Sequence, residues 1–221
     1  MSDRIDFSVI IPSFNRPDAL LSCLAAIREL NYPSERLEVI VVDDGSTVSY
    51  AEAKDEFPEA SFLSIKNSGP GLARNIGAKE ARGRYLAFTD DDCYVHPEWL
   101  NRLRETFGIH PSSLVGGSTP AHPDTNLYDR VSQFITGIVY DYYNSWPERA
   151  EFFASNNLAI CRQLFFELEG FPTCHTKNAA EDRSLCNLAL SAGKRLIWNR
   201  EAIVFHKPDL DLIKFCRMYF R

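Results

Sequence analysis

Three carboxylates at the end of a short apolar run constrain this chain more than any other feature. Tyr85 to Phe88 is rich in strand-forming residues, and Asp90, Asp91 and Asp92 follow it after a single threonine. Like charges this close repel one another unless a positive group lies among them. Ligands bind at the carboxyl ends of strands in open α/β sheets, and a hard divalent cation bridging to phosphates would supply the charge. A solvated acidic turn is the alternative interpretation.

The first ninety residues alternate between strand and helix patterns. Apolar runs of strand length lie at 7–11, 37–42, 62–65 and 84–89, with helical patterns between them. This alternation predicts right-handed crossovers and a parallel sheet. Three loops, each following a strand, then meet at one edge of the sheet. They bring together Phe14 and Asn15, Asp43 and Asp44, and the carboxylates Asp90 to Asp92.

The rest of the chain has less regular patterns. We expect, in chain order, a helix from Pro97, strands over 114–119 and 152–160, a helix over 162–169, a helix from Glu181, and short strands over 195–198 and 203–205. The stretch 126–146 is rich in aromatic residues but has no clear period, so its side chains serve either packing or a sugar platform. Gly116 and Gly117 would allow their strand to approach a ligand closely.

Together these patterns predict an α/β fold with a mostly parallel central sheet and helices on both faces. A chain of 221 residues is long enough for one domain with a large core. We expect a single Rossmann-like domain with a first half over 1–116, a second half over 117–206 and an amphipathic tail over 207–221.

Composition narrows the function and the compartment. The net charge of −6 argues against a general nucleic-acid binder. The six cysteines include no CxxC pair, so we expect reduced, buried thiols; a zinc site at Cys174 and His175 is an alternative that lacks a second ligand pair. Charged residues interrupt the N-terminus, and no segment has the roughly 18 apolar residues of a membrane span. We therefore expect a cytoplasmic protein, either free or at the inner face of a membrane.

Several segments together resemble the family-2 glycosyltransferases. The matching pieces are Ser8–Arg16, Val41–Ser46, Gly69–Asn75, Phe88–Asp92, Glu181, Asp182 and His206. The resemblance covers nearly the whole chain and implies the A-type nucleotide-sugar fold, with donor half 1–116 and acceptor half 117–206. It implies a metal-dependent, inverting transfer of a sugar from a nucleotide-diphosphate sugar, with a uridine donor favoured, to an acceptor hydroxyl.

The resemblance assigns the donor-binding residues. Pro12 and Phe14 would flank the nucleobase and Asp43 would accept a hydrogen bond from it, which suits an aromatic face and a carboxylate. Arg74 would lie near the diphosphate or anchor Asp43. Gly71 belongs either to a phosphate-cradling loop or to an ordinary helix start. The remaining residues expected to contact the nucleotide sugar are Asn15, Asp44, Asn75, Asp90 and Asp91.

A metal site is also implied, at the pair Asp90 and Asp92. Asp92 would bind Mg²⁺ or Mn²⁺, and Asp90 would lie by the ribose or the metal. His206 matches a histidine that joins the metal shell, and its imidazole fits Mn²⁺ better than Mg²⁺. A hydrogen-bonding role for His206 is the alternative. The ion would stabilise the charge that grows as the nucleoside diphosphate departs.

In the acceptor half, Asp182 would be the catalytic base that takes the proton from the attacking hydroxyl. Its expected place in the first turn of a helix favours the ionised form, although acids there often serve only to stabilise the helix. Glu181 is the second choice for the base. Asn156 and Asn157 would line the acceptor or donor-sugar pocket. The acceptor is expected to be a carbohydrate or a lipid-linked molecule.

The last residues, Leu210 to Arg221, interleave apolar and basic side chains. Such a helix either touches a membrane surface peripherally or packs back on the domain.

Two other functions remain open. A sugar-phosphate nucleotidylyltransferase has a similar sheet but needs a glycine-rich loop after the first strand, where this chain has Pro12 to Asn15. A nucleotide-sugar-binding domain without turnover is the non-enzymatic alternative, and Asp182 and His206 argue against it.

Overall fold

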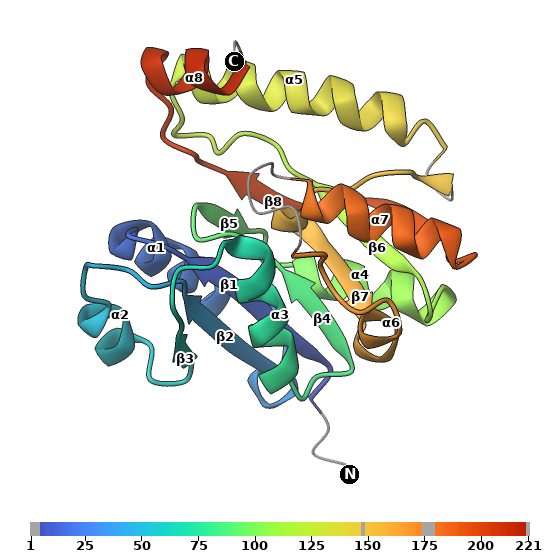
Figure 1. The fold of residues 1–221 in the computed structure, drawn as a ribbon, viewed down its shortest axis with the longest axis horizontal. Coiled ribbons are helices and arrows are strands. Elements are labelled where there is room, and N and C mark those ends of the chain that lie inside the picture. The colour runs from blue at the N-terminus through green and yellow to red at the C-terminus, as the bar shows by residue number, and fades with distance from the viewer. Residues whose placement is uncertain (1–4, 147–148, 174–179, 220–221) are drawn as a thin grey trace.

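The computed structural model describes residues 5–146, 149–173 and 180–219, which form a mixed α/β fold around one curled sheet (Figure 1). The sheet has eight strands in the order β3-β2-β1-β4-β7-β6-β8-β5. This confirms the predicted Rossmann-like α/β fold class.

The first half alternates strand and helix, as the sequence predicts. Its elements are β1 (Phe7–Ser13), α1 (Pro17–Arg28), η1 (Ser34–Arg36), β2 (Leu37–Asp43), α2 (Ala51–Glu56), β3 (Ser61–Ser64), α3 (Pro70–Glu80) and β4 (Tyr85–Phe88). β1 pairs in parallel with both β2 and β4, and β2 pairs in parallel with β3. The loops that follow these strands therefore leave the sheet at one edge.

The second half is less regular and its pairing is mixed. Its elements are β5 (Cys93–Val95), α4 (Trp99–Ile109), β6 (Leu114–Ser118), α5 (Leu127–Tyr143), η3 (Ser155–Asn157), β7 (Leu158–Cys161), α6 (Arg162–Glu167), α7 (Glu181–Ser191), β8 (Leu196–His206) and α8 (Leu212–Tyr219). β7 lies antiparallel to β4 and β6, β5 lies antiparallel to β8, and β6 is parallel to β8.

Three local expectations differ from the structure. The two short strands expected over 195–205 form one strand, β8, because a register shift opposite Gly116 and Ser118 accommodates the polar residues between them. The strand expected over 152–160 is reduced to β7, preceded by a single 3₁₀ turn. The two glycines of β6 meet protein rather than an open cleft: a Cβ at Gly116 would lie 2.0 Å from Phe153 Cγ, and one at Gly117 would lie 2.0 Å from the Ala202 carbonyl oxygen.

Two apolar cores cover the two faces of the sheet. Alternate residues of β1 point to opposite faces, so Val9 and Ile11 join a core with α1 and α4, while Ile10 joins a core with α3, α6 and α7. α5 and α8 lie together as a separate layer, remote from the N-terminus (Figure 1). The sheet is thus firmly held from both faces where the loops of the first half emerge.

The five described cysteines are all unpaired. Cys23, Cys93 and Cys186 are buried, as expected, whereas Cys216 is exposed. The alternative zinc site at Cys174 and His175 lies outside the described residues. A search of the described helices finds none with the length and apolar character needed to cross a bilayer.

Candidate functional site

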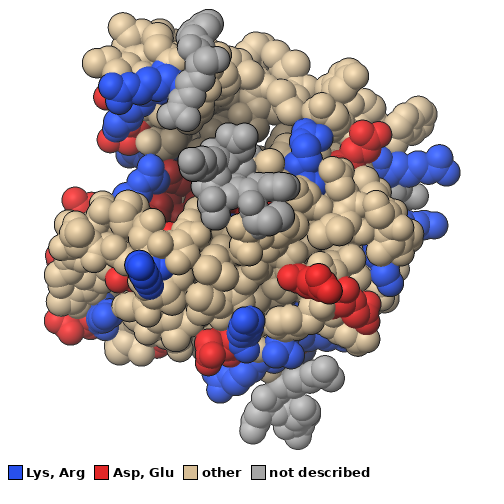
Figure 2. Space-filling model, in the orientation of Figure 1, with Lys and Arg blue, Asp and Glu red and all other residues tan. Residues whose placement is uncertain are grey.

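A cleft of about 480 Å³ opens at the edge where the parallel strands end. Figure 2 shows acidic side chains at the bottom of a hollow on this face. The lining residues come from the end of β1, the loops after β1, β2 and β4, the first half of α3, the stretch before β7 and the start of α7. They are Pro12, Ser13, Phe14, Arg16, Asp44, Pro70, Arg74, Asp90, Asp91, Asp92, Ala154, Ser155, Asn156, Glu181 and Asp182.

Arg16 supplies positive charge to two of the three consecutive carboxylates. Its Nη1 lies 2.6 Å from Asp92 Oδ2 and 3.3 Å from Asp91 Oδ1. Ser13 Oγ donates to Asp91 Oδ2 at 2.7 Å. Burial nevertheless raises the pKa of Asp91 to about 6, with Asp92 adding to the effect and the Ser13 hydrogen bond opposing it. Asp91 is therefore a carboxyl group whose charge the fold disfavours.

Arg74 supplies charge to the third carboxylate. Its side chain is buried, and it forms ion pairs with Asp90 and, at 3.3 Å, with Glu181 Oε1. Burial alone would lower the pKa of Arg74, but Asp90 and Glu181 outweigh that and raise it. Of the two roles expected for Arg74, its contacts link the loop after β4 to the start of α7 and do not involve Asp43.

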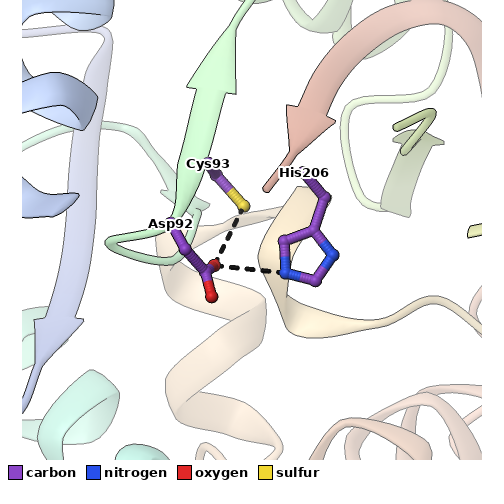
Figure 3. A group of neighbouring side chains, drawn as sticks. All are labelled: Asp92, Cys93 and His206. Carbon is purple, nitrogen blue, oxygen red and sulfur yellow. Dashed lines mark hydrogen bonds and ion pairs between the residues drawn. The ribbon is translucent and has the colours of Figure 1, made fainter. Parts of the chain in front are cut away.

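Asp92 and His206 meet because β5 pairs with the end of β8 (Figure 3). Cys93 lies opposite His206 in this antiparallel register. His206 Nε2 is 3.2 Å from Asp92 Oδ1, and one ligand atom from each of Asp92, Cys93 and His206 falls within a 4.8 Å group.

The chemistry of these donor atoms fits a divalent cation. A carboxylate and an imidazole suit Mn²⁺, whereas Cys93 is a buried thiol whose pKa is raised by burial and by the nearby carboxylates. Burial alone would raise the pKa of Asp92 and lower that of His206. Their mutual hydrogen bond reverses both effects, so the pKa of Asp92 is lowered and that of His206 is raised. The pair therefore keeps Asp92 ionised, whereas His206 must lose its proton before it can ligate a cation.

His206 has a second neighbour that the sequence did not reveal. Its Nδ1 makes a short contact with Gln133 Nε2 from α5. Gln133 is 8% exposed, and its Oε1 has no hydrogen-bond partner among the described residues.

Asp182 stands apart from these ion pairs. It opens α7, and among the described residues it has no ion-pair partner, whereas the adjacent Glu181 pairs with Arg74. Burial raises the pKa of Asp182, and Glu181 adds to this, while the amide N–H groups of Arg183 and Ser155 oppose it. A carboxylate with a raised pKa at the wall of a cleft is suited to take up a proton.

Pro12 and Phe14 line the cleft, and Phe14 is 45% exposed there. Asp43, Asp44 and Asn15 instead order the neighbouring loops. Asp43 accepts from the Ser46 amide, and Asp44 accepts from the amides of Ser68 and Gly69. Asn15, at φ 56°, accepts from the Thr47 amide. Of these three, only Asp44 reaches the cleft lining.

The remaining predicted residues divide between the cleft and the packing around it. Asn156 lines the cleft, and its buried Oδ1 has no hydrogen-bond partner among the described residues. Asn157 lies outside the lining, with its amide bonded to Trp99, Ser118 and Ala202. Asn75 holds the backbone of Phe171 from both sides. Gly71 makes room for Glu181, whose Cγ would lie 3.3 Å from a Cβ at that position.

Sequence reasoning did not assign roles to Ser13, Arg16, Ser155 and Gln133. Arg16 is the last residue of the segment Ser8–Arg16 that carries the family resemblance, and its position in a loop after a strand was the available signal. Gln133 had no signal, because it lies in the stretch 126–146 where no period was found.

A larger hollow of about 810 Å³ lies elsewhere, against α3, α6 and α7. Leu72, Phe165, Phe166 and Leu188 contribute to its wall, and none of the carboxylates discussed above does. The smaller cleft is therefore the candidate site, because it is where the charged groups converge.

Comparison with known proteins gives a consistent result. The family model described as Glycosyl transferase family 2 matches residues 8–171. The glycosyltransferase AglE of Haloferax volcanii is 36% identical over 124 residues, which are 53% of this chain and 41% of that protein.

Two solved structures share the fold. TarS of S. aureus in complex with UDP-GlcNAc matches 94% of this chain and 60% of that one, with a TM-score of 0.74 and 19% identity. The mannosyltransferase PcManGT of Pyrobaculum calidifontis, in complex with GDP-Man and Mn²⁺, matches 92% of this chain and 57% of that one, with a TM-score of 0.71 and 23% identity. The chain spans less than two thirds of the length of each of these three relatives.

Proposed function

The chain belongs to glycosyl transferase family 2, and on that premise we propose that it transfers a sugar from a nucleotide-diphosphate sugar to an acceptor hydroxyl with inversion. The observation that carries the proposal is the meeting of Asp92 and Asp182 in one cleft, since the first suits a cation and the second suits a proton. A uridine donor is favoured.

Residues 1–116 are the proposed donor half. Phe14 offers an exposed aromatic face to the nucleobase, and Pro12 lies beside it in the cleft lining. Asp43 is the proposed acceptor of a base N–H, because it is the last residue of β2 and so lies at the carboxyl edge of the sheet. The hydrogen bonds of Asn15 and Asp44 to neighbouring backbone amides hold the loops at this edge of the sheet in place. Arg16 and Arg74 both line the cleft and are the proposed cations for the diphosphate.

Asp92 and His206 are the proposed ligands for Mg²⁺ or Mn²⁺, with Asp90 beside them. When bound, the ion neutralises the charge that develops on the departing nucleoside diphosphate. The imidazole favours Mn²⁺, and the name of the PcManGT complex includes that ion. Arg16 is proposed to hold Asp91 and Asp92 in place when the cation is absent.

Residues 117–206 are the proposed acceptor half, with Asp182 as the base. Its raised pKa makes it a better proton acceptor than an ordinary aspartate, and its place in the cleft lining leaves it accessible to an acceptor. Glu181 is the weaker choice, because its carboxylate is already paired with Arg74. Asn156, with a free amide oxygen at the cleft, is proposed to bind a sugar hydroxyl.

The acceptor is proposed to be a carbohydrate or a lipid-linked molecule, as in the synthesis of polysaccharide or glycolipid. Peripheral membrane contact belongs to this proposal only if the acceptor is lipid-linked.

A binding screen tests the donor and the metal together. Uridine, guanosine and other nucleotide-diphosphate sugars are titrated calorimetrically with Mn²⁺, with Mg²⁺ and with a chelator. We expect one donor class to bind in a metal-dependent way and to release nucleoside diphosphate when a suitable acceptor is added. Formation of a nucleotide sugar and pyrophosphate from a nucleoside triphosphate would instead indicate a nucleotidylyltransferase. Donor binding without any transfer would indicate the non-enzymatic alternative.

A further inference from the structure

Helix α5 (Leu127–Tyr143) has its polar side buried and its apolar side exposed. Asp129, Ser132 and Gln133 are at most 8% exposed. Surface helices of globular proteins normally show the opposite arrangement. The exposed side carries a stripe at helical spacing, with residues between 37% and 76% exposed: Leu127, Val131, Phe134, Ile138 and Tyr142.

Specific hydrogen bonds explain why the polar side faces inward. Asp129 Oδ1 accepts from the Leu210 amide, and Asn126 Nδ2 donates to the Leu210 carbonyl. The hydroxyls of Ser132 and Tyr219 lie 2.9 Å apart. These contacts hold α5 to the segment leading into α8 and to α8 itself. The orientation of α5 is therefore fixed by paired polar groups, and the apolar stripe is left facing out.

Helix α8 (Leu212–Tyr219) extends this surface. It packs on α5 through Phe215, whose ring centroid is 5.9 Å from that of Tyr128. Leu212 and Ile213 are exposed beside it, as are Lys214 and Arg217. Figure 2 shows lysine and arginine, with acidic side chains beside them, at the α8 end of this layer, below an uncharged rim. We call the exposed apolar stripe of α5, together with Leu212 and Ile213, the α5/α8 platform.

We propose that the α5/α8 platform lies on the surface of a bilayer that contains anionic lipid. A helix with an apolar stripe and basic neighbours buries that stripe ~5–10 Å into the headgroup boundary. Tyr142 and Trp146, each 76% exposed, are side chains that favour this interface. Arg130, Lys214 and Arg217 are exposed cations that complement anionic head groups.

The platform lies close to the candidate site, so contact with a bilayer would bring the cleft near the membrane surface. The inner side of α5 touches His206 through Gln133, so about one helix diameter, roughly 10 Å, separates the proposed bilayer surface from the metal-binding residues. A lipid-linked acceptor could then reach the cleft while its lipid remains in the bilayer. The choice of acceptor rests on the proposed function, whereas binding of the platform to lipid does not.

Sedimentation with vesicles tests the platform directly. The probes are vesicles of equal parts phosphatidylcholine and phosphatidylglycerol, and vesicles of phosphatidylcholine alone. We expect the protein to bind the anionic vesicles, and Phe134→Asp with Ile138→Asp to weaken binding about tenfold or more. Lys214→Glu and Arg217→Glu should each cost about fivefold, and only on anionic vesicles. The matched control is Ile109→Asp, which changes an apolar residue of α4 that is 75% exposed.

Three outcomes would overturn the platform proposal. The protein could ignore both vesicle types, or the α5 double variant could bind as well as the Ile109→Asp control. The protein could also form a dimer that Phe134→Asp dissociates, without binding vesicles, which would assign the platform to a second copy. Release of nucleoside diphosphate with a water-soluble acceptor, measured in parallel, shows whether the proposed transfer survives any of these results.

A separate observation concerns Gln133, whose amide nitrogen faces His206 Nδ1 while its oxygen has no partner. Reversing the amide would satisfy the oxygen and leave the nitrogen without a partner instead. The surroundings of the amide therefore favour neither orientation strongly. Amide oxygen and nitrogen positions are assigned from such networks.

We infer that Gln133 is a positioning residue that accepts a hydrogen bond from His206 Nδ1–H when a cation is bound. A histidine that ligates metal through one nitrogen donates the other N–H to an acceptor, which fixes its tautomer. In this structure Nε2 is the nitrogen that faces Asp92. Turning the amide over would hold the proton on Nδ1 and leave the Nε2 lone pair free for the ion.

Titration with Mn²⁺, in the presence and absence of UDP, tests this role. Gln133→Met removes the acceptor and should weaken Mn²⁺ binding about 10- to 100-fold. Gln133→Glu, whose ionised carboxylate only accepts hydrogen bonds, should bind Mn²⁺ at least as well as wild type. Thr136→Ala, which removes a hydroxyl that bonds to the Ser132 carbonyl within α5, is the control and should leave the affinity unchanged. Nitrogen NMR of the Mg²⁺-bound protein should place the His206 proton on Nδ1.

The inference fails if Gln133→Glu binds Mn²⁺ as weakly as Gln133→Met, or if Gln133→Met binds as tightly as wild type. A proton on Nε2 in the Mg²⁺-bound protein would also overturn it. Metal-independent donor binding by the wild type would remove the metal assignment itself, and the transfer assay would then show whether the enzyme activity stands without it.

Discussion

The two ends of the parallel strands treat their carboxylates in opposite ways. At the amino end, Glu38 of β2 accepts from Ser8 Oγ at 2.6 Å and from the Arg82 amide and Nε at 2.6 and 2.8 Å. Burial alone would raise the pKa of Glu38, but these hydrogen bonds lower it. In the cleft at the carboxyl end, burial raises the pKa values of Asp91 and of Asp182 from α7, whereas His206 and Arg16 keep the pKa of Asp92 lowered.

This difference separates stability from function within one sheet. A carboxylate whose pKa is lowered contributes to folding, whereas one whose pKa is raised opposes it. Groups that cost stability cluster where a protein binds or transforms a ligand. We therefore expect substitutions at the carboxyl end to reduce activity without reducing stability, and substitutions at the amino end to do the reverse.

The largest expected effect is on turnover, from Asp182→Asn. Removing the base should lower kcat about 10²- to 10⁴-fold, because the attacking hydroxyl then keeps its proton. Donor affinity and the melting temperature should change little. In the wild type, the rate should fall as the pH drops through the raised pKa of Asp182, since the base must be ionised. Steady-state kinetics across pH measure both effects, and an unchanged kcat would refute the base assignment.

The next effect is on donor affinity, from Asp92→Ala. Losing a ligand to the cation should weaken metal-dependent donor binding about a hundredfold, equivalent to about 3 kcal/mol. Calorimetric titration of the donor measures this. Wild type with a chelator should match the variant, and Asp55→Ala on the exposed surface of α2 should behave as wild type. Equal donor affinities for wild type and Asp92→Ala in the presence of Mn²⁺ would refute the metal-binding role of Asp92, and with it the functional role of the carboxyl end of the strands.

A smaller effect concerns stability, from Asp91→Asn in metal-free buffer. The folded-state pKa of about 6 lies above the unfolded value, so the folded state binds the proton more tightly. Wild-type stability contributed by this group is therefore present at acid pH and lost as the pH rises from about 4 to 6. Asp91→Asn should raise the free energy of unfolding at pH ~8 by about 1–3 kcal/mol relative to wild type.

Denaturant unfolding at acid and alkaline pH measures the Asp91 effect. The advantage of Asp91→Asn should shrink towards acid pH, where the wild-type carboxyl is already protonated. A variant less stable than wild type at pH ~8 would mean that the pairing with Arg16 outweighs the burial of the charge.

The smallest effect has the opposite sign, from Glu38→Gln. Loss of the charge from these hydrogen bonds should lower the free energy of unfolding by about 1 kcal/mol at neutral pH, with activity retained. Because the folded pKa of Glu38 is lowered, this contribution should be lost as the pH falls through that value. Denaturant melts of both proteins at several pH values supply the measurement. A loss of activity at unchanged stability would contradict the proposed division between the two ends.

The carboxyl end of the parallel half is predictable from sequence, and the reason is local. A strand that is buried on both faces has a nearly continuous apolar sequence, and β1 is buried at all seven positions. Its sequence therefore indicates a central strand, and the polar residues that follow emerge at the edge of the sheet. One cleft is accordingly lined by Phe14, Asp90, Asp92 and Asp182. Asp92 also pairs with His206.

The second half is less predictable because its contacts are long-range. β5 has only three residues, too few to show a period, yet it brings Asp92 to His206. α5 buries its polar side chains and exposes its apolar ones, so the usual rule that the apolar face of a helix is buried does not apply to it. The pairing of Arg16 with Asp91 and Asp92 joins residues more than seventy positions apart, and no local pattern encodes such a choice.

The pairing of β5 with β8 determines whether Asp92 and His206 can meet at all. Cys93 lies opposite His206 and Tyr94 opposite Phe205, so adjacent residues present alternate faces. Removing one residue from the irregular middle of β8 would shift this frame and turn the imidazole away from Asp92 while every charged group stayed in the chain. Loss of the centre can thus arise from a change in chain length alone, which a list of retained motif residues would not detect.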